Sequence, residues 1–252
     1  MKQNAYSQDS EWLSRCEDFE QSVLKYKSVR FSHFISPHEL AVFRTRYRLS
    51  PDVTFMAWGG SSDAERVVLG FFPDFLTPDK EDFPVTPLLI TNVGGMNHPD
   101  VLGSVLGLGI KREMVGDIYF EGDSAVLMCE NTAKDYILYN LKTVGRKKVE
   151  VQILPPDTEF SLKHEFKIIR AVVASLRLDA VVAAATNMSR GDAAKHIAQE
   201  NVNVNFTVAQ NPDKKLVAGD VISVRHHGRF ELTSIAGETR KGRTVLEIKK
   251  YI

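Results

Sequence analysis

Two arginines and a serine near the starts of consecutive predicted helices are the side chains best suited to bind an anion. Ser189 stands where a helix-capping hydroxyl is expected, Arg190 follows it, and Arg177 lies at the start of the preceding apolar helical segment. The first N–H groups of a helix attract phosphate, and a guanidinium donates two parallel hydrogen bonds to it. We therefore predict a phosphate-binding surface made of these residues and Lys195. The alternatives are an ion pair of Arg177 with Asp179 and a solvent-facing Lys195.

A second basic cluster follows a predicted strand and turns at a glycine. It consists of Arg225, His226, His227 and Arg229, and Gly228 between them allows the chain to turn tightly. The adjacent histidines have no Cys or carboxylate at metal-ligand spacing, so no metal site is predicted. Hydrogen bonding of Arg225, His227 and Arg229 to RNA is one interpretation, and a plain surface loop is the other.

Charge is distributed unevenly over the 252 residues, although the net charge is zero. Residues 170–252 carry 13 Lys and Arg against 8 Asp and Glu, whereas the remainder carries 19 against 24. This asymmetry predicts that the carboxy-terminal part meets a polyanion. With 43% hydrophobic residues, no apolar run of membrane-spanning length and a polar, acidic amino terminus, the chain is expected to be globular, cytoplasmic and not associated with a membrane.

Two helices and several strands must position the basic residues. Apolar residues at helical spacing predict a helix over 176–185 that ends at Asn187, and Ser189 begins a second helix over 190–199. Alternating apolar residues predict strands over 202–206 and 221–225, and a final strand near 245–250. The residues 170–252 are therefore expected to form one α+β domain.

The rest of the chain is predicted to be α+β as well, in two parts. A small amino-terminal unit, residues 1–75, is expected to contain a helix with Trp12, a helix capped by Ser36, and strands over 53–58 and 66–72. The central part, residues 76–156, has the pattern β-α-β-β-α-β, which is that of a ferredoxin-like domain. Many RNA-binding proteins and many enzymes share that fold, so it does not decide the function.

Short stretches of the last third occur in a characteristic order: Arg177-Leu178-Asp179, Ser189-Arg190, Ala193-Ala194, Val202-Asn203-Val204-Asn205 and Gly219-Asp220-Val221-Ile222-Ser223-Val224. Their order and spacing resemble the S4 domain of ribosomal and tRNA-binding proteins. The central stretches Gly94-Gly95-Met96-Asn97-His98-Pro99-Asp100, Leu106-Gly107-Leu108-Gly109 and Val115-Gly116-Asp117-Ile118, with the closing Ile248-Lys249-Lys250-Tyr251-Ile252, resemble the YlmH family of bacterial proteins.

The resemblance implies an RNA-binding protein, not an enzyme, without a cofactor. It implies docking on the large ribosomal subunit, contact with rRNA and tRNA, and a role in quality control of stalled ribosomes, as in the related protein RqcP. Arg177 and Arg190 would correspond to the RNA-contacting arginines of the family. One alternative is a protein-interaction adaptor, for instance in cell division, that binds its partner through Trp12 of the amino-terminal unit. The other is an RNA-modifying enzyme, because Arg177-Leu178-Asp179 resembles the surroundings of the catalytic aspartate in pseudouridine synthases.

Overall fold

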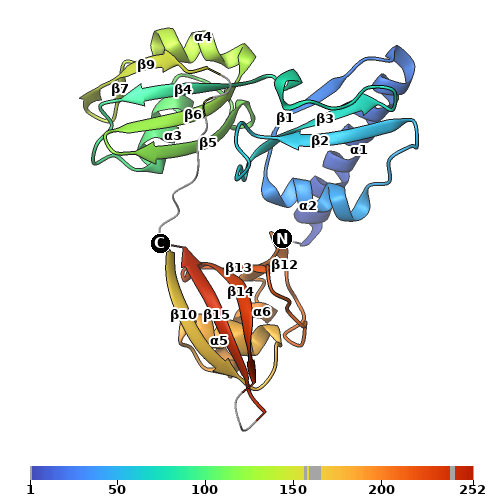
Figure 1. The fold of residues 1–252 in the computed structure, drawn as a ribbon, viewed down its shortest axis with the longest axis vertical. Coiled ribbons are helices and arrows are strands. Elements are labelled where there is room, and N and C mark those ends of the chain that lie inside the picture. The colour runs from blue at the N-terminus through green and yellow to red at the C-terminus, as the bar shows by residue number, and fades with distance from the viewer. Residues whose placement is uncertain (1, 156–157, 159–165, 239–241, 252) are drawn as a thin grey trace. The chain divides into compact units, whose positions relative to one another are not determined.

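The structure is a computed structural model, and it describes residues 2–155, 158, 166–238 and 242–251. The chain divides into two compact units, residues 1–163 and residues 164–252 (Figure 1). Both contain helices and antiparallel sheets, so the predicted α+β class is confirmed. No helix in the described part of the chain is long and apolar enough to cross a membrane.

The first unit begins with a three-stranded antiparallel sheet and two helices. The strand order is β1-β3-β2, and the elements are α1 (Lys2–Tyr26), β1 (Arg30–Ile35), α2 (Pro37–Arg46), β2 (Val53–Trp58) and β3 (Val67–Pro73). Ser36 caps α2 as predicted, because its side chain accepts from the Glu39 N–H while the Glu39 carboxylate accepts from the Ser36 N–H. Trp12 is only 3% exposed and belongs to the core of this part.

A four-stranded antiparallel sheet of order β5-β6-β4-β9 follows in the same unit. Its elements are η1 (Lys80–Asp82), β4 (Val85–Thr91), α3 (His98–Gly107), η2 (Arg112–Met114), β5 (Val115–Glu121), β6 (Ser124–Glu130), α4 (Asn131–Asn140) and β9 (Glu150–Ile153), with a small hairpin of β7 (Thr143–Val144) and β8 (Lys147–Lys148). The helix α4 ends at Asn140, because the chain turns there into β7.

The two faces of the central sheet pack on different partners. Leu88 and Leu127 face a core shared with α3 and α4, whereas Val126 and Met128 belong to a cluster that also contains Phe34 and other residues of the three-stranded sheet. Both faces of β6 are therefore covered, which explains why its sequence is almost continuously apolar. The domain boundary near residue 75 stays a prediction.

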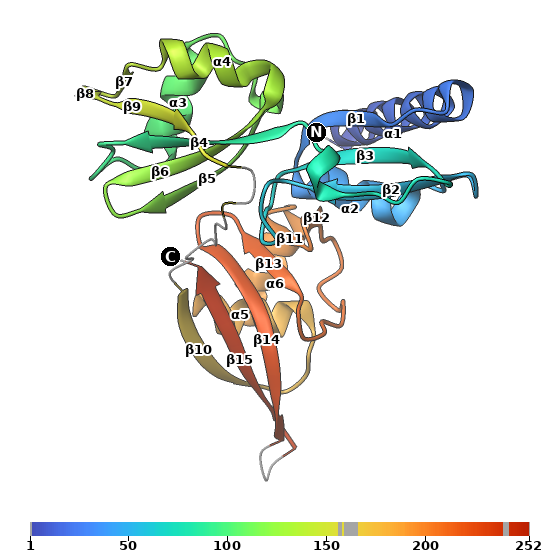
Figure 2. The same cartoon turned by 45° about the horizontal axis from the view of Figure 1, so that its top comes forward.

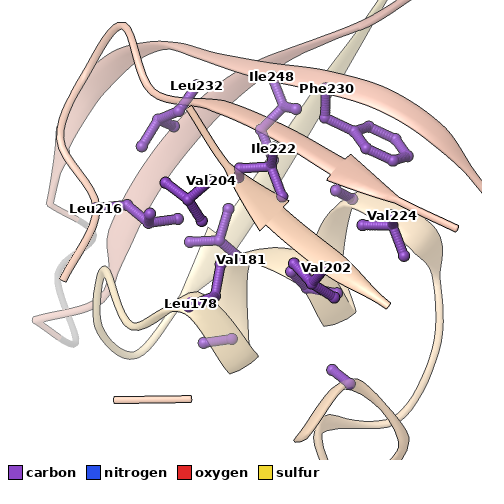
Figure 3. Packing of buried hydrophobic residues seen from close by; sticks show 14 of the residues in the cluster. Leu178, Val181, Val202, Val204, Leu216, Ile222, Val224, Phe230, Leu232 and Ile248 are labelled. Carbon is purple, nitrogen blue, oxygen red and sulfur yellow. The ribbon is translucent and has the colours of Figure 1, made fainter. Parts of the chain in front are cut away.

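The second unit packs two helices on one face of a six-stranded antiparallel sheet (Figures 1 and 2). The strand order is β10-β15-β14-β13-β11-β12, and the elements are β10 (Phe166–Val173), α5 (Leu178–Thr186), α6 (Arg190–Ala198), β11 (Val202–Val204), β12 (Thr207–Val208), β13 (Val221–Val224), β14 (Gly228–Glu238) and β15 (Thr244–Tyr251). Leu178 and Val181 of α5 pack against Ile222, Leu232 and Ile248 of the sheet (Figure 3).

The strands that were not predicted include β1, which lies between the first two helices, and β7. β14 was not predicted either: it begins at Gly228, so Arg229 of the second basic cluster lies in a strand. The sharp turn itself is present, with φ of 67° at His226 and 104° at Gly228. The expected end of the first helix of this unit is also present, since Asn187 caps α5 in the left-handed conformation with φ of 58°.

Candidate nucleic-acid interface

Arg177 and Arg190 come together on one buried carboxylate. Asp179, in the first turn of α5, is 5% exposed. Arg177 immediately precedes α5 and donates from Nε and from a terminal nitrogen to Asp179 at 3.2 and 3.0 Å. Arg190, the first residue of α6, donates to the two carboxylate oxygens at 3.2 and 2.9 Å. Asp179 thus links the starts of the two helices and orients both guanidinium groups.

The charges of this group reinforce one another. Burial by itself would raise the pKa of the Asp179 carboxyl, but the hydrogen bonds from Arg177 and Arg190 outweigh it and hold the pKa below its ordinary value. The hydrogen bond to Asp179 in turn raises the pKa of Arg177. Arg177 also forms an ion pair with Asp213, which is an exposed residue. The side chains of Arg177 and Arg190 remain 37% and 52% exposed, so both are accessible to a ligand.

A loop far along the chain completes this surface. The Leu178 N–H donates to the Lys214 carbonyl at 2.8 Å, and the Asp179 N–H donates to the Pro212 carbonyl at 3.1 Å. These bonds satisfy N–H groups at the start of α5 and hold the loop against the helix. Lys214 and Lys215, both exposed, are thereby brought beside Arg177. No local sequence pattern indicates the contact of Lys214 and Lys215 with the start of α5, because this loop is distant from α5 in sequence.

The start of α6 is capped as predicted but already carries a carboxylate. The Ser189 hydroxyl oxygen accepts from the Asp192 N–H at 3.1 Å and donates to the Asp192 carboxylate at 2.7 Å. The hydrogen bond from Ser189, followed by that from Lys195, lowers the pKa of Asp192. The Lys195 Nζ atom lies 3.4 Å from an Asp192 carboxylate oxygen, and the lysine side chain is largely exposed. Lys195 therefore faces the solvent, as the alternative interpretation expected. A phosphate approaching this helix start must compete with Asp192.

The second basic cluster lies near the other end of α6. The ring of His227 meets that of His196 edge to face at a centroid distance of 5.7 Å. Arg229 lies over the ring of Phe206 at 5.4 Å, while Arg225 is exposed. The sequence did not single out Phe206 as part of a site. Arg225, His227 and Arg229 therefore lie in one region, apart from the Arg177–Arg190 pair and joined to it by the length of α6.

Neither cluster has the arrangement of a metal site. Among the residues that the structure describes, no three His, Cys, Asp or Glu side chains are grouped so that they could hold a metal ion. Within that same part of the chain, the Nδ1 atom of His196 is buried and makes no hydrogen bond. What the two clusters offer is a set of cations and planar side chains that suit phosphates and bases.

Comparisons with known proteins bear on the whole chain. Residues 78–158 match a family model described as "Putative RNA-binding domain in YlmH". Over 233 residues the chain is 27% identical to the "Ribosome-associated protein quality control protein P2" of Bacillus subtilis (strain 168), covering 91% of this chain and 90% of that protein. These matches support the assignment of the chain to the YlmH family. The recognition of YlmH from sequence is therefore confirmed.

A solved YlmH structure supports the fold. The "Cell division protein ylmH from Streptococcus pneumoniae" is 21% identical to this chain, with a TM-score of 0.53, and the match covers 59% of this chain and 92% of that one. At this identity the likeness concerns the fold alone. None of these comparisons tests the RNA-binding roles of the individual residues named above.

Proposed function

We propose that this protein binds structured RNA on the ribosome and that the Arg177–Arg190 pair in its carboxy-terminal unit is the principal contact. The observation that carries the proposal is the shared buried carboxylate of Asp179, which fixes two partly exposed guanidinium groups side by side. Fixed, planar donors are well suited to phosphate, because little side-chain freedom is lost when they bind. The basic excess of residues 170–252 supports a polyanionic partner.

The finer proposal is that the unit is an S4 module that docks on the large ribosomal subunit and contacts rRNA and tRNA during rescue of stalled ribosomes. The order of two helices followed by strands supports the S4 assignment. The strand order β5-β6-β4-β9, with α3 and α4 in the connections, supports a ferredoxin-like central part. The name of the Bacillus subtilis relative supports the ribosomal setting, and Ser189, Lys195, Arg225, His227 and Arg229 are the further proposed RNA contacts.

The two carboxylates that pair with Arg177 play different parts when a phosphate binds. Asp179 is buried and stays with the arginines, whereas Asp213 is exposed and pairs only with Arg177 among the contacts described. An incoming phosphate can take the place of Asp213 on Arg177, because an exposed ion pair contributes little stability. Phosphate binding also releases counterions, so affinity should fall about tenfold or more over a few-fold rise in salt concentration.

The rival functions find less support in the structure. The adaptor hypothesis relied on Trp12 as an exposed contact, but Trp12 is buried and its indole N–H donates to the Glu39 carbonyl at 2.9 Å. Although the streptococcal structure is titled a cell division protein, no exposed Trp12 surface is available for that role. A catalytic role for Asp179 is disfavoured because both arginines already engage its carboxylate.

The test is recovery of RNA with the tagged protein from cells, compared between the wild type and the Arg177→Ala/Arg190→Ala variant. Lys167→Ala/Arg170→Ala is the matched control, since it removes two exposed cations from β10 of the same unit. We expect the wild type and control to recover large-subunit rRNA and tRNA, and the arginine variant to lose at least tenfold, because each base or phosphate contact contributes about 1–3 kcal/mol.

A variant of opposite sign sharpens the same test. Asp213→Asn removes the exposed competitor of Arg177 and should strengthen RNA binding in vitro, with the gain shrinking as salt is raised. If the folded arginine variant recovers as much ribosomal RNA as the wild type, the pair is not the contact and the proposal fails.

A further inference from the structure

The first unit contains a cavity of about 700 Å³ that none of the predicted sites uses. It lies between Trp58 of β2, Lys80 and Glu81 of η1, the β4 residues Thr86 and Pro87, and the first turn of α4, with Ile153 and Leu154 completing the wall. Its volume falls within the range of small-molecule sites, about 300–1,000 Å³.

Trp58 provides an aromatic wall that is held in place. The indole packs against the apolar cluster of Phe83 and Met128 and remains half-buried. The Lys80 ammonium lies 5.9 Å from its ring centroid, so the ring already attracts a cation. An anchored tryptophan of this kind is a platform on which a flat ring, such as a nucleobase, can stack.

The charged and polar groups of the cavity favour an anionic ligand that also forms hydrogen bonds. Lys80 and Lys134 face only one acidic residue among the lining side chains, Glu81. The Thr86 hydroxyl donates to the Asn131 side-chain oxygen at 2.5 Å. In that orientation the Asn131 amide nitrogen is a donor on the cavity wall, suited to an acceptor on the edge of a base.

We propose that this cavity binds one unpaired nucleotide of an RNA chain, with its base stacked on Trp58 and its phosphate near Lys80 and Lys134. The RNA context rests on the proposed function, but the nucleotide site itself does not, because Arg177 and Arg190 belong to the other compact unit. The aromatic wall suits the face of the base, the amide donor suits its edge, and the two lysines suit the phosphate. A peptide is the rival occupant, and it would not require both lysines.

The experiment measures binding of adenosine 5′-monophosphate and of adenosine to the full chain by calorimetry and by tryptophan fluorescence. The chain has two tryptophans, and Trp12 is buried, so quenching should report on Trp58. We expect Trp58→Leu to weaken both ligands about tenfold, because stacking on an aromatic side chain dominates such contacts, while Trp58→Phe retains most of the affinity.

Two further variants distinguish loss of the phosphate contacts from a general loss of structure. Lys80→Ala/Lys134→Ala should weaken the monophosphate several-fold and leave adenosine nearly unchanged, a difference that a general loss of structure would not produce. Tyr139→Leu is the matched aromatic control, since Tyr139 is on α4, is 68% exposed and does not line the cavity. It should bind both ligands like the wild type.

The inference is overturned if the wild type binds neither ligand at millimolar concentration, or if Trp58→Leu, folded by circular dichroism, binds both unchanged. It is also overturned if Arg177→Ala/Arg190→Ala abolishes binding of the monophosphate, because the nucleotide would then be held at the arginine pair. Binding that depends on Trp58 combined with undiminished ribosomal RNA recovery by the arginine variant would keep this site and reject the proposed function.

Discussion

At the residue scale, Asp179 decides whether the two arginines act as a pair. Around the helix starts, the acidic Asp179, Asp192 and Asp213 offset the charges of Arg177, Arg190 and Lys195, so the positive excess of this surface comes from the neighbouring Lys214 and Lys215. The site is therefore not a plain concentration of positive charge. Its value for RNA binding lies in the positions of the guanidinium groups, and those positions depend on one buried carboxylate.

Asp179→Asn should reduce the stability of the second unit by about 1–3 kcal/mol at neutral pH, because it removes the negative charge and replaces one of the two acceptor oxygens with an NH2 group that cannot accept from the arginines. The pKa of Asp179 in the folded protein lies below its ordinary value of 3.8, so its stabilising effect is present above that pH and is lost as pH falls through the folded pKa. Hydrogen exchange of α5 and α6 at pH 7 and near pH 3 measures this. The difference between wild type and variant should shrink at the lower pH, and a constant difference would mean that the Asp179 charge is not responsible.

At the scale of elements, the sequence predicted those whose signals are local. Ser36 and Ser189 cap helices as expected, and β2 coincides with the predicted strand over 53–58. β14 was missed because its pairing with β15 shifts register twice, after Leu232 and after Ile235, so its residues do not alternate cleanly. The approach of Arg177 to Arg190 was expected from the S4 resemblance, but Asp213 reaches the site through tertiary contacts that no local pattern encodes.

The turn between α5 and α6 sets the spacing of the two arginines. Asn187 caps α5 at a positive φ of 58°, a conformation that costs most residues about 1–2 kcal/mol. Asn187→Gly should therefore keep both stability and RNA affinity, whereas Asn187→Ala should lose about 1 kcal/mol of stability and weaken RNA binding. The test is to monitor thermal unfolding of both variants by hydrogen exchange and to measure their affinity for RNA. Equal behaviour of the two variants would show that the turn does not control the pair.

At the scale of the whole molecule, the chain has two compact units with separate cores. The core of the second unit is built around Leu178, Val181 and the inward residues of β13, β14 and β15 (Figure 3). Each unit buries its own apolar cluster. Independent unfolding of the two units is the expectation that follows.

Leu178→Ala provides the test, because Leu178 is fully buried in the second unit. Its truncation should cost that unit about 2–5 kcal/mol and increase hydrogen exchange throughout α5, α6 and their sheet. Both tryptophans, Trp12 and Trp58, are in the first unit, so the urea transition followed by tryptophan fluorescence should stay at the wild-type midpoint. RNA recovery should fall with the second unit, while nucleotide binding at Trp58 persists. A fluorescence midpoint that moves together with the exchange rates would show instead that the two units fold as one.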